Sequence, residues 1–445
     1  MSEHALGAEL AVWTVLPFVG LLLSIAILPL ATPRFWEHNR NRALVCAAFA
    51  VPVVVYLPAA FGGEGVHALL EKAEEYAAFI VLLASLYVIT GVIHVRGSLS
   101  GTPLLNTAIL ALGSALASVI GTTGASVLLI RPLLRANAPR RRVVHVVIFF
   151  IFGVSNCGGL LTPLGDPPLF LGFLKGVPFE WTLALWREWL LVNGVLLGVF
   201  HVWDQVVFAR EERERPGAQL EEVQQHEPLR IEGARNFAFL AGVVLVIYGA
   251  GRGFGYAGEP WPFGVQEILM GVLAFAAYAT TDPGLRERNH FTFAPINEVA
   301  ILFAGIFATM APALLILNHR APSFGIAEPW QFFWAAGSLS SFLDNAPTYL
   351  TFAATACGLA GVDLEGRYLA RYLELGPESA AILAAISCGA VFMGANTYIG
   401  NGPNFMVKAI AEERGVRMPS FFGYMAYSGA ILLPIFAAVT LIFFA

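Results

Sequence analysis

Apolar stretches about as long as the 20 residues that cross a bilayer recur along the chain, and they constrain the fold more than any other feature. Charged residues make up 13% of the 445 positions, whereas soluble proteins carry roughly 25%. The sequence therefore predicts an all-α integral membrane protein. Apolar segments are expected at 10–31, 43–61, 76–95, 103–135, 143–174, 182–208, 236–250, 264–281, 294–317, 328–358, 379–411 and 421–444.

Two of these segments, 103–135 and 328–358, are too long for one crossing and are interrupted midway. Residues 121–124 (GTTG) break the first, and residues 344–347 (DNAP) break the second. We predict that each forms a pair of half-length helices in a re-entrant hairpin, which a membrane tolerates where the tip is buried in protein or lines a wet cavity. The expected fold has about ten transmembrane helices plus these two hairpins.

The order of parts repeats on either side of a polar stretch at 209–235, which we interpret as a cytoplasmic linker. Residues 1–208 and 236–445 each contain three spans, a hairpin, a broken segment and one more span. The broken segments are 143–174 and 379–411. Paired interruptions in inverted halves are the best sequence pointer to a midplane binding site in a transporter.

Loop charges predict the orientation, because short cytoplasmic loops are rich in Lys and Arg. Arginines follow the first span, the first hairpin, the segment 264–281 and the second broken segment, whereas glutamates gather between these loops. The second half then runs upside down relative to the first. We expect a multi-pass protein of the cell (inner) membrane with both termini outside.

Short motifs match between the two halves. Residues 118–125 align without gaps on residues 341–348. Ser155-Asn156-Cys157 is paired with residues 395–397 (Ala-Asn-Thr), and the element beginning Gly165-Asp166 is paired with the one beginning at Gly400. These elements occur in the same order in both halves, which favours a true internal repeat.

Breaks inside membrane helices free backbone carbonyls that coordinate cations, and their polar side chains add hard oxygen ligands. The sequence thus predicts an ion-binding core at the two broken segments and the hairpin tips. The candidate residues are Asn156, Asp166, Asn396, Thr397, Asp344, Asn345, Thr122, Thr123, Ser155 and Asn401.

Two candidate carboxylates, Asp166 and Asp344, fall at the breaks. A charged group at the bilayer centre costs about 2.5–3.5 kcal/mol on insertion scales, so it is usually functional. Burial favours the protonated form, and a group held there can carry either a proton or a metal cation. This competition is the minimum requirement for cation/proton exchange. Glu298 is a further candidate for proton coupling; capping of helix ends is the alternative role for the aspartates.

The runs SNCGGLLTPLGDPP, INEVAILFAGIF and SFLDNAP resemble the ion transporter superfamily, which includes citrate and divalent anion–sodium symporters, and look closest to NhaD-type sodium/proton antiporters. The resemblance implies a scaffold domain, a transport domain, an elevator-like movement and a homodimer. It implies sodium binding at Asn156 and Asn396, to which we add Asp166 and Asp344. Cys157 and Ala395 replace residues that carry hydroxyls in the symporters, so the organic-anion site is not carried over.

The favoured function is a secondary active sodium/proton antiporter, with sodium as a coupled substrate and no cofactor. Sodium-coupled symport of a small anion, a carboxylate or bicarbonate, is the alternative. An intramembrane aspartyl protease is disfavoured because Pro163 stands where that family's signature has Gly, and because an inverted repeat has no purpose there. An enzyme is therefore not expected. Nucleic acid is not expected as a partner, because no basic patch is interleaved with aromatic residues.

Overall fold

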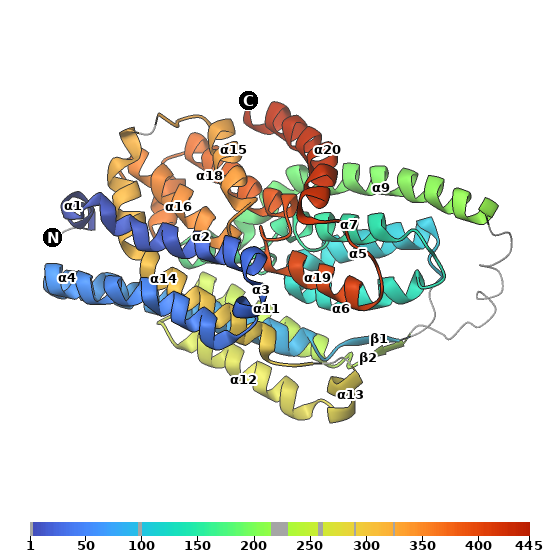
Figure 1. Ribbon diagram of the computed structural model, residues 1–445. Helices are drawn as coiled ribbons and strands as arrows, with labels where there is room; N and C mark the ends of the chain where they lie inside the picture. Colours follow the sequence, from blue (N-terminus) through green and yellow to red (C-terminus); the bar gives the residue numbers. More distant parts are fainter. Residues whose placement is uncertain (1–2, 97–99, 215–229, 257–260, 289–290, 324) are drawn as a thin grey trace.

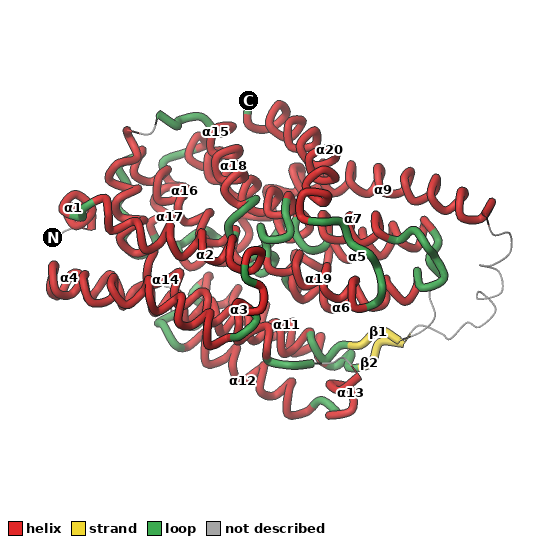
Figure 2. The backbone as a smooth tube through the Cα atoms, in the orientation of Figure 1, coloured by secondary structure: helices red, strands yellow, loops and turns green. Residues whose placement is uncertain are grey.

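A computed structural model describes residues 3–96, 100–214, 230–256, 261–288, 291–323 and 325–445. Helices dominate these residues, as the sequence predicts (Figures 1 and 2). One departure from an all-α fold is a short antiparallel pair of strands, β1 (His94–Arg96) and β2 (Arg230–Glu232). The pair joins the chain just before the first hairpin to the chain just before the second half.

Seven helical stretches in the described part of the chain are long and apolar enough to cross a membrane. These stretches are Val12–Pro29, Asn39–Thr90, Pro103–Ile120, Phe179–Glu214, Ala294–Ser323, Pro377–Asn396 and Phe421–Phe444. Three shorter apolar helices add to them, and the protein is therefore a membrane protein with several transmembrane helices.

Helix α4 (Asn39–Thr90) is two helices joined at Gly62. Gly62 has φ 58° and ψ −128°, a conformation that glycine adopts without a steric penalty. The chain folds back there so closely that a Cβ on Gly65 would lie 2.1 Å from the Leu57 carbonyl oxygen. This reversal agrees with the separate segments predicted at 43–61 and 76–95.

One group of helices packs around α4 and α14 (Ala294–Arg320). Aromatic rings hold this group together: the Phe79 ring lies 4.7 Å from that of Phe303 and 5.9 Å from that of Phe307, measured between centroids. In Figure 1 the group occupies the lower left of the view. Its other members are α1 (Glu3–Glu9), η1 (Val12–Val15), α2 (Leu16–Ala31), α3 (Pro33–Trp36), α11 (Asn236–Arg252), α12 (Val265–Thr280), α13 (Pro283–Arg288) and η4 (Ala321–Ser323).

A second group contains the hairpins and the broken segments. From the first half come α5 (Pro103–Ile120), α6 (Thr122–Ala136), α7 (Val144–Gly153), η2 (Cys157–Leu160), α8 (Pro167–Leu174), η3 (Phe179–Leu185) and α9 (Trp186–Glu214). From the second half come α15 (Pro329–Ser340), α16 (Asn345–Leu359), α17 (Tyr368–Glu374), α18 (Pro377–Met393), η5 (Gly394–Asn396), α19 (Gly402–Glu413), α20 (Phe421–Val439) and the π-helical η6 (Thr440–Phe444).

The predicted hairpins are pairs of helices. Gly121 alone joins α5 to α6, with φ 81° and ψ 150°, and the two helices pack on each other. The expectation of half-length helices is wrong for α5, whose 18 residues make it one of the candidate spans. A turn of residues 341–344 joins α15 to α16, and the Asp344 carboxylate caps α16 by accepting from Ala346 N at 3.1 Å.

The two broken segments cross between the hairpins. Helix α8 packs against α16 from the other half, and α19 packs in the same way against α6. Both helices start at a Pro or Gly-Pro step directly after a polar N-cap, Asp166 for α8 and Asn401 for α19. The start of each second half-helix therefore lies near the hairpin tip of the opposite half.

The predicted linker at 209–235 is only partly within the described residues. Helix α9 continues through Glu214, and residues 230–232 form β2, so both ends of the segment have regular structure. Its middle, residues 215–229, lies outside the described ranges.

Candidate ion-binding site

Asp166 lies at the point where four helices begin. It is the N-cap of α8, and its side chain is 1% exposed. Thr122 and Asn345 are the first residues of α6 and α16, and Asn401 is the N-cap of α19. Helix N-termini carry partial positive charge from unpaired backbone N–H groups, so this convergence favours a negative charge.

Neutral groups from the other three helices hydrogen-bond to the Asp166 carboxylate. Thr122 Oγ1 donates to Oδ1 at 2.9 Å, and Asn401 Nδ2 donates to the same oxygen at 3.3 Å. Asn345 Nδ2 donates to Oδ2. Both hairpins and both broken segments therefore contact one carboxylate, and the three donors carry no formal charge.

A chain of amides continues from Asp166 into the first broken segment. Asn401 Nδ2 also lies 3.2 Å from Asn156 Oδ1, and Asn156 Nδ2 donates to Asn404 Oδ1 at 2.6 Å. Asn404 Nδ2 in turn donates to the backbone oxygens of Gly394 and Thr397, at 2.8 and 2.9 Å. Asn404 is not among the candidate residues predicted above, although it lies three residues after Asn401 in the same polar run at 394–404.

Two amide oxygens in this region have no hydrogen-bond partner among the described residues. Asn345 Oδ1 and Asn396 Oδ1 are both buried and unpaired. Their amide nitrogens are used, by Asp166 and by Ser341 Oγ respectively. Buried polar atoms are almost always satisfied, so two orphaned carbonyl oxygens mark places where a cation could be coordinated.

Asn156 differs from Asn396 in this respect. Its Nδ2 donates to Ile151 O at 2.8 Å as well as to Asn404, and its Oδ1 accepts from Asn401. The Asn156 amide is thus held by protein groups at both ends. It positions Asn401 and Asn404, whereas Asn396 leaves an oxygen unused.

The contacts also give the register between the two broken segments. Thr162 Oγ1 donates to the Ser118 carbonyl, and Thr397 Oγ1 donates to the Ser341 carbonyl at 2.5 Å. Thr162 therefore corresponds to Thr397, which places Leu161 rather than Asn156 opposite Asn396. The pairing of residues 155–157 with 395–397 that we drew from the sequence is wrong, whereas the pairing of Asp166 with Asn401 agrees with these contacts.

The remaining predicted residues lie in or beside this network. Ser155 Oγ is 2.7 Å from Ser126 Oγ, and its carbonyl accepts from Asn401 Nδ2 at 3.2 Å. The Thr123 side chain is half-buried and lines a cavity next to Asp166. Among the described residues, Asp344 makes its capping bond to Ala346 but no hydrogen bond to Asp166.

Glu298 is not brought to the network. Its carboxylate pairs with Arg42 at 3.0 Å, and its side chain is 39% exposed. The neighbouring residues Pro295, Ile296 and Val299 line the cavity next to Asp166, but Glu298 does not. Its predicted part in proton coupling has no hydrogen-bonded route to Asp166 among the described residues.

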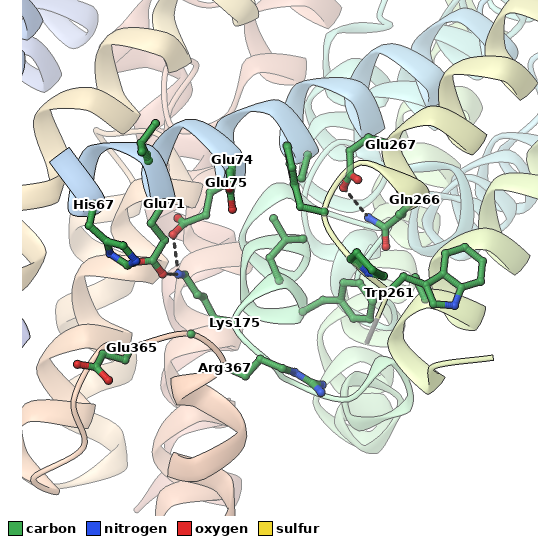
Figure 3. A pocket seen from close by; sticks show the side chains of 18 of the residues that line it. His67, Glu71, Glu74, Glu75, Lys175, Trp261, Gln266, Glu267, Glu365 and Arg367 are labelled. Carbon is green, nitrogen blue, oxygen red and sulfur yellow. Dashed lines mark hydrogen bonds and ion pairs between the residues drawn. The ribbon is translucent and has the colours of Figure 1, made fainter. Parts of the chain in front are cut away.

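Two cavities lie along the contact between α4 and α8. The smaller, about 70 Å³, is lined by Asp166, Thr122 and Thr123 together with residues of α4 and α14. The larger, about 790 Å³, lies at the far end of α8 around Lys175, Glu71 and Glu75 (Figure 3). None of the predicted site residues lines the larger cavity.

The described residues contain no group of three His, Cys, Asp or Glu side chains placed to hold a metal ion. All four cysteines are buried and free. A cation at Asp166 would therefore take its ligands from one carboxylate plus amide, hydroxyl and backbone oxygens. Such oxygen ligands suit hard cations rather than soft ones.

Comparison with known proteins agrees with a transporter. A family model described as "Putative citrate transport" matches residues 7–444. None of the curated proteins searched matches the chain. The match supports the citrate-carrier side of the resemblance, while closeness to NhaD-type antiporters stays a prediction. Since the match covers nearly the whole chain, the protein belongs to this citrate transport family and is a membrane transporter.

Proposed function

We propose that the protein is a secondary active transporter that exchanges sodium for a proton at Asp166 by alternating access. The observation that carries this proposal is the surroundings of Asp166: a buried carboxylate with three neutral donors, next to an orphaned amide oxygen of Asn345. Taking a carboxylate that lacks a cationic partner out of water costs free energy, and a proton or a bound cation offsets this cost. Competition between the two produces exchange.

The ligands proposed for sodium are those predicted from the sequence, except that Asn156 becomes a positioning residue. Asp166 supplies the charge, and Asn345 Oδ1 and Asn396 Oδ1 supply free oxygens. Asp344 adds a second half-buried carboxylate at the tip of the second hairpin. Asn156 has the role of holding Asn401 and Asn404 in place.

The occupant of Asp166 would act on both halves of the molecule at once. Thr122 and Asn345 begin helices of different hairpins, and each donates to a different oxygen of the carboxylate. Protonation removes an acceptor from one of them, while sodium draws the oxygens toward itself. The arrangement of the hairpins therefore depends on which ion is bound, as ion coupling requires.

The test is a flux measurement on purified protein in liposomes, with pH and sodium gradients imposed separately. Sodium that leaves down an outward gradient should bring protons in and acidify the lumen, and D166N should reduce this acidification to the level of empty liposomes. E298Q is the matched control, because Glu298 pairs with Arg42 instead of Asp166. Proton flux that ignores sodium in the native protein would overturn the proposal.

Coupled uptake of a small carboxylate is the second candidate, and two observations favour it. The family is described by citrate transport, and four helix N-termini converge at Asp166. In this case the charged Asp166 carboxylate interacts with the helix N-termini that would otherwise bind a substrate carboxylate. Its protonation, or a bound sodium ion, removes the repulsion so that a substrate carboxylate can bind at the helix ends.

Labelled citrate separates the two candidates. Sodium- or proton-driven accumulation of citrate in the same liposomes supports symport. Sodium-dependent proton movement without citrate, at a rate that citrate does not change, supports antiport.

The finer topology belongs to the same proposal. The matching contacts of Thr162 with Ser118 and of Thr397 with Ser341 support two related halves, which we place in inverted orientation with both termini outside the cell membrane. We also propose a homodimer. Protease accessibility of terminal tags on intact cells tests the orientation, and the mass of the purified protein corrected for detergent tests the dimer.

A further inference from the structure

Helix α8 connects Asp166 to a buried lysine. Asp166 is its N-cap and Lys175 its C-cap, and the eight residues between them span about 12 Å at 1.5 Å per residue. Lys175 is 4% exposed, and its carbonyl accepts from Leu369 N at 3.0 Å. A shift of α8 along its axis would therefore move Asp166 and the backbone of Lys175 together.

Lys175 is bound to two glutamates of α4. Its Nζ lies 2.6 Å from Glu71 Oε1 and 2.5 Å from Glu75 Oε1 (Figure 3). Lys72 also contacts Glu75 Oε1, at 2.6 Å. We call Lys72, Glu71, Glu75 and Lys175 the Lys175 cluster. It ties the end of α8 to the helix group that packs around α4.

The cluster lies on the same seam as Asp166. Along α4, residues up to Ala78 line the larger cavity, and residues from Phe79 to Tyr87 line the smaller one. Along α8, Phe173 and Lys175 line the larger cavity, whereas Asp166 and Phe170 line the smaller. The two cavities thus follow one another between α4 and α8, with the cluster in the wall of the larger and Asp166 in the wall of the smaller.

We propose that the seam between α4 and α8 is the route by which ions reach Asp166, and that Lys175 is its gate. The proposal rests on Asp166 being the ion site. Release of Lys175 from Glu71 and Glu75 lets the end of α8 move away from α4 and joins the two cavities.

The cluster is suited to opening because one of its carboxylate oxygens has no hydrogen-bond partner among the described residues and because it faces the larger cavity, of about 790 Å³. Glu75 is 7% exposed, yet its Oε2 has no hydrogen-bond partner among the described residues. Both glutamates line the larger cavity, so a cation in that cavity competes with Lys175 for the same carboxylates. Glu75 keeps Lys72 when Lys175 leaves, so opening does not leave the Glu75 carboxylate without a cationic partner.

Cysteine accessibility tests the gate without relying on transport. All four native cysteines are buried, which gives a low background. T123C is a nearly isosteric probe in the wall of the smaller cavity. S114C is its matched control, because Ser114 is 1% exposed, lines neither of these two cavities, and its hydroxyl has no partner to lose. The purified full chain in detergent is treated with a small trimethylammonium methanethiosulfonate.

We expect K175Q to accelerate the modification of T123C at least tenfold and to leave S114C unchanged. K175R keeps the charge and should restore the slow rate. E71Q removes one partner and leaves Lys175 in place, so it should give an intermediate rate and serves if K175Q does not fold. Modification of T123C at equal rates in the parent, K175Q and E71Q overturns the gate.

The result is independent of the transported ion. If T123C behaves as expected but D166N transports normally, the gate stands and the assignment of Asp166 fails. If D166N abolishes transport while T123C ignores Lys175, the ion site stands and the route lies elsewhere.

Discussion

At the residue scale, the site is organised by amides that act as connectors as well as possible ligands. Asn404 is the main connector, because its amide joins Asn156 of the first half to the backbone of the second broken segment. Its counterpart in the first half, in the register given by Thr162 and Thr397, is Leu169. The two halves therefore have different chemistry at equivalent positions.

Replacing Asn404 with Leu should destabilise the protein. N404L leaves the Asn156 amide and two backbone oxygens without their partner, and each unsatisfied buried group costs about 1–3 kcal/mol. Thermal unfolding in detergent, followed by intrinsic fluorescence, measures the loss. An unchanged melting temperature for N404L would contradict the connector role.

How far the sequence predicts the site depends on whether a signal is local. Asp166, Thr122, Asn345 and Asn401 are marked by breaks in apolar runs, and all four do meet. The roles of Asn404 and Asn156 depend on a contact between residues more than half the chain apart, so no local pattern shows which of them is a ligand and which a connector. The same reason explains the wrong pairing of Asn156 with Asn396. The two residues share a residue type, but the contacts that repeat between the halves are made by Thr162 and Thr397.

At the element scale, the broken segments depend on glycine for close backbone approach. A Cβ on Gly165 would lie 2.1 Å from the carbonyl oxygen of Gly159, and one on Gly400 would lie 2.6 Å from that of Gly394. These pairs hold each break in a tight loop before the second half-helix begins. Breaks of this kind were predictable from Gly and Pro, but the paired crossings were not.

G165A should therefore disrupt the first break, whereas G402A should be tolerated. Nothing lies within 4 Å of a Cβ on Gly402, which starts α19, and Ala there removes backbone freedom from the unfolded chain. We expect G165A to reduce folded yield sharply in size-exclusion chromatography and G402A to match the parent. Equal yields for the two variants would show that the loop relaxes without loss.

Helix lengths were less predictable than helix positions. The pattern of apolar residues located both hairpins, but it could not show that Gly121 alone connects α5 and α6 and leaves α5 at full length. It also located two segments around Gly62 without showing that they form one continuous hairpin. A single glycine with positive φ is enough to reverse a helix, and sequence alone does not distinguish it from a glycine within one.

At the scale of the whole molecule, the site draws its groups from both halves, so binding of an ion must stabilise the entire fold. A ligand that binds only the folded state at 100 times its Kd adds about 2.7 kcal/mol to the free energy of unfolding. Sodium should raise the melting temperature of the native protein in a concentration-dependent way. D166N should remove this dependence, with choline chloride as the ionic-strength control; a shift that is equal for sodium and choline would argue against a sodium site.

The two hairpin tips differ in structure, and this difference makes the two directions of a transport cycle inequivalent. The first tip is one glycine with a φ of 81°, a conformation that residues with a side chain rarely adopt; the second is a turn whose helix is capped by the side chain of Asp344. Loss of such a cap costs about 0.5–2 kcal/mol. Protonation of Asp344 would weaken this cap reversibly, whereas the Gly121 turn has no side chain to protonate. Only the second hairpin tip can therefore be loosened during a transport cycle, while the first keeps its conformation. Inward and outward movement then involve different hairpins to different extents, so they need not share a rate-limiting step.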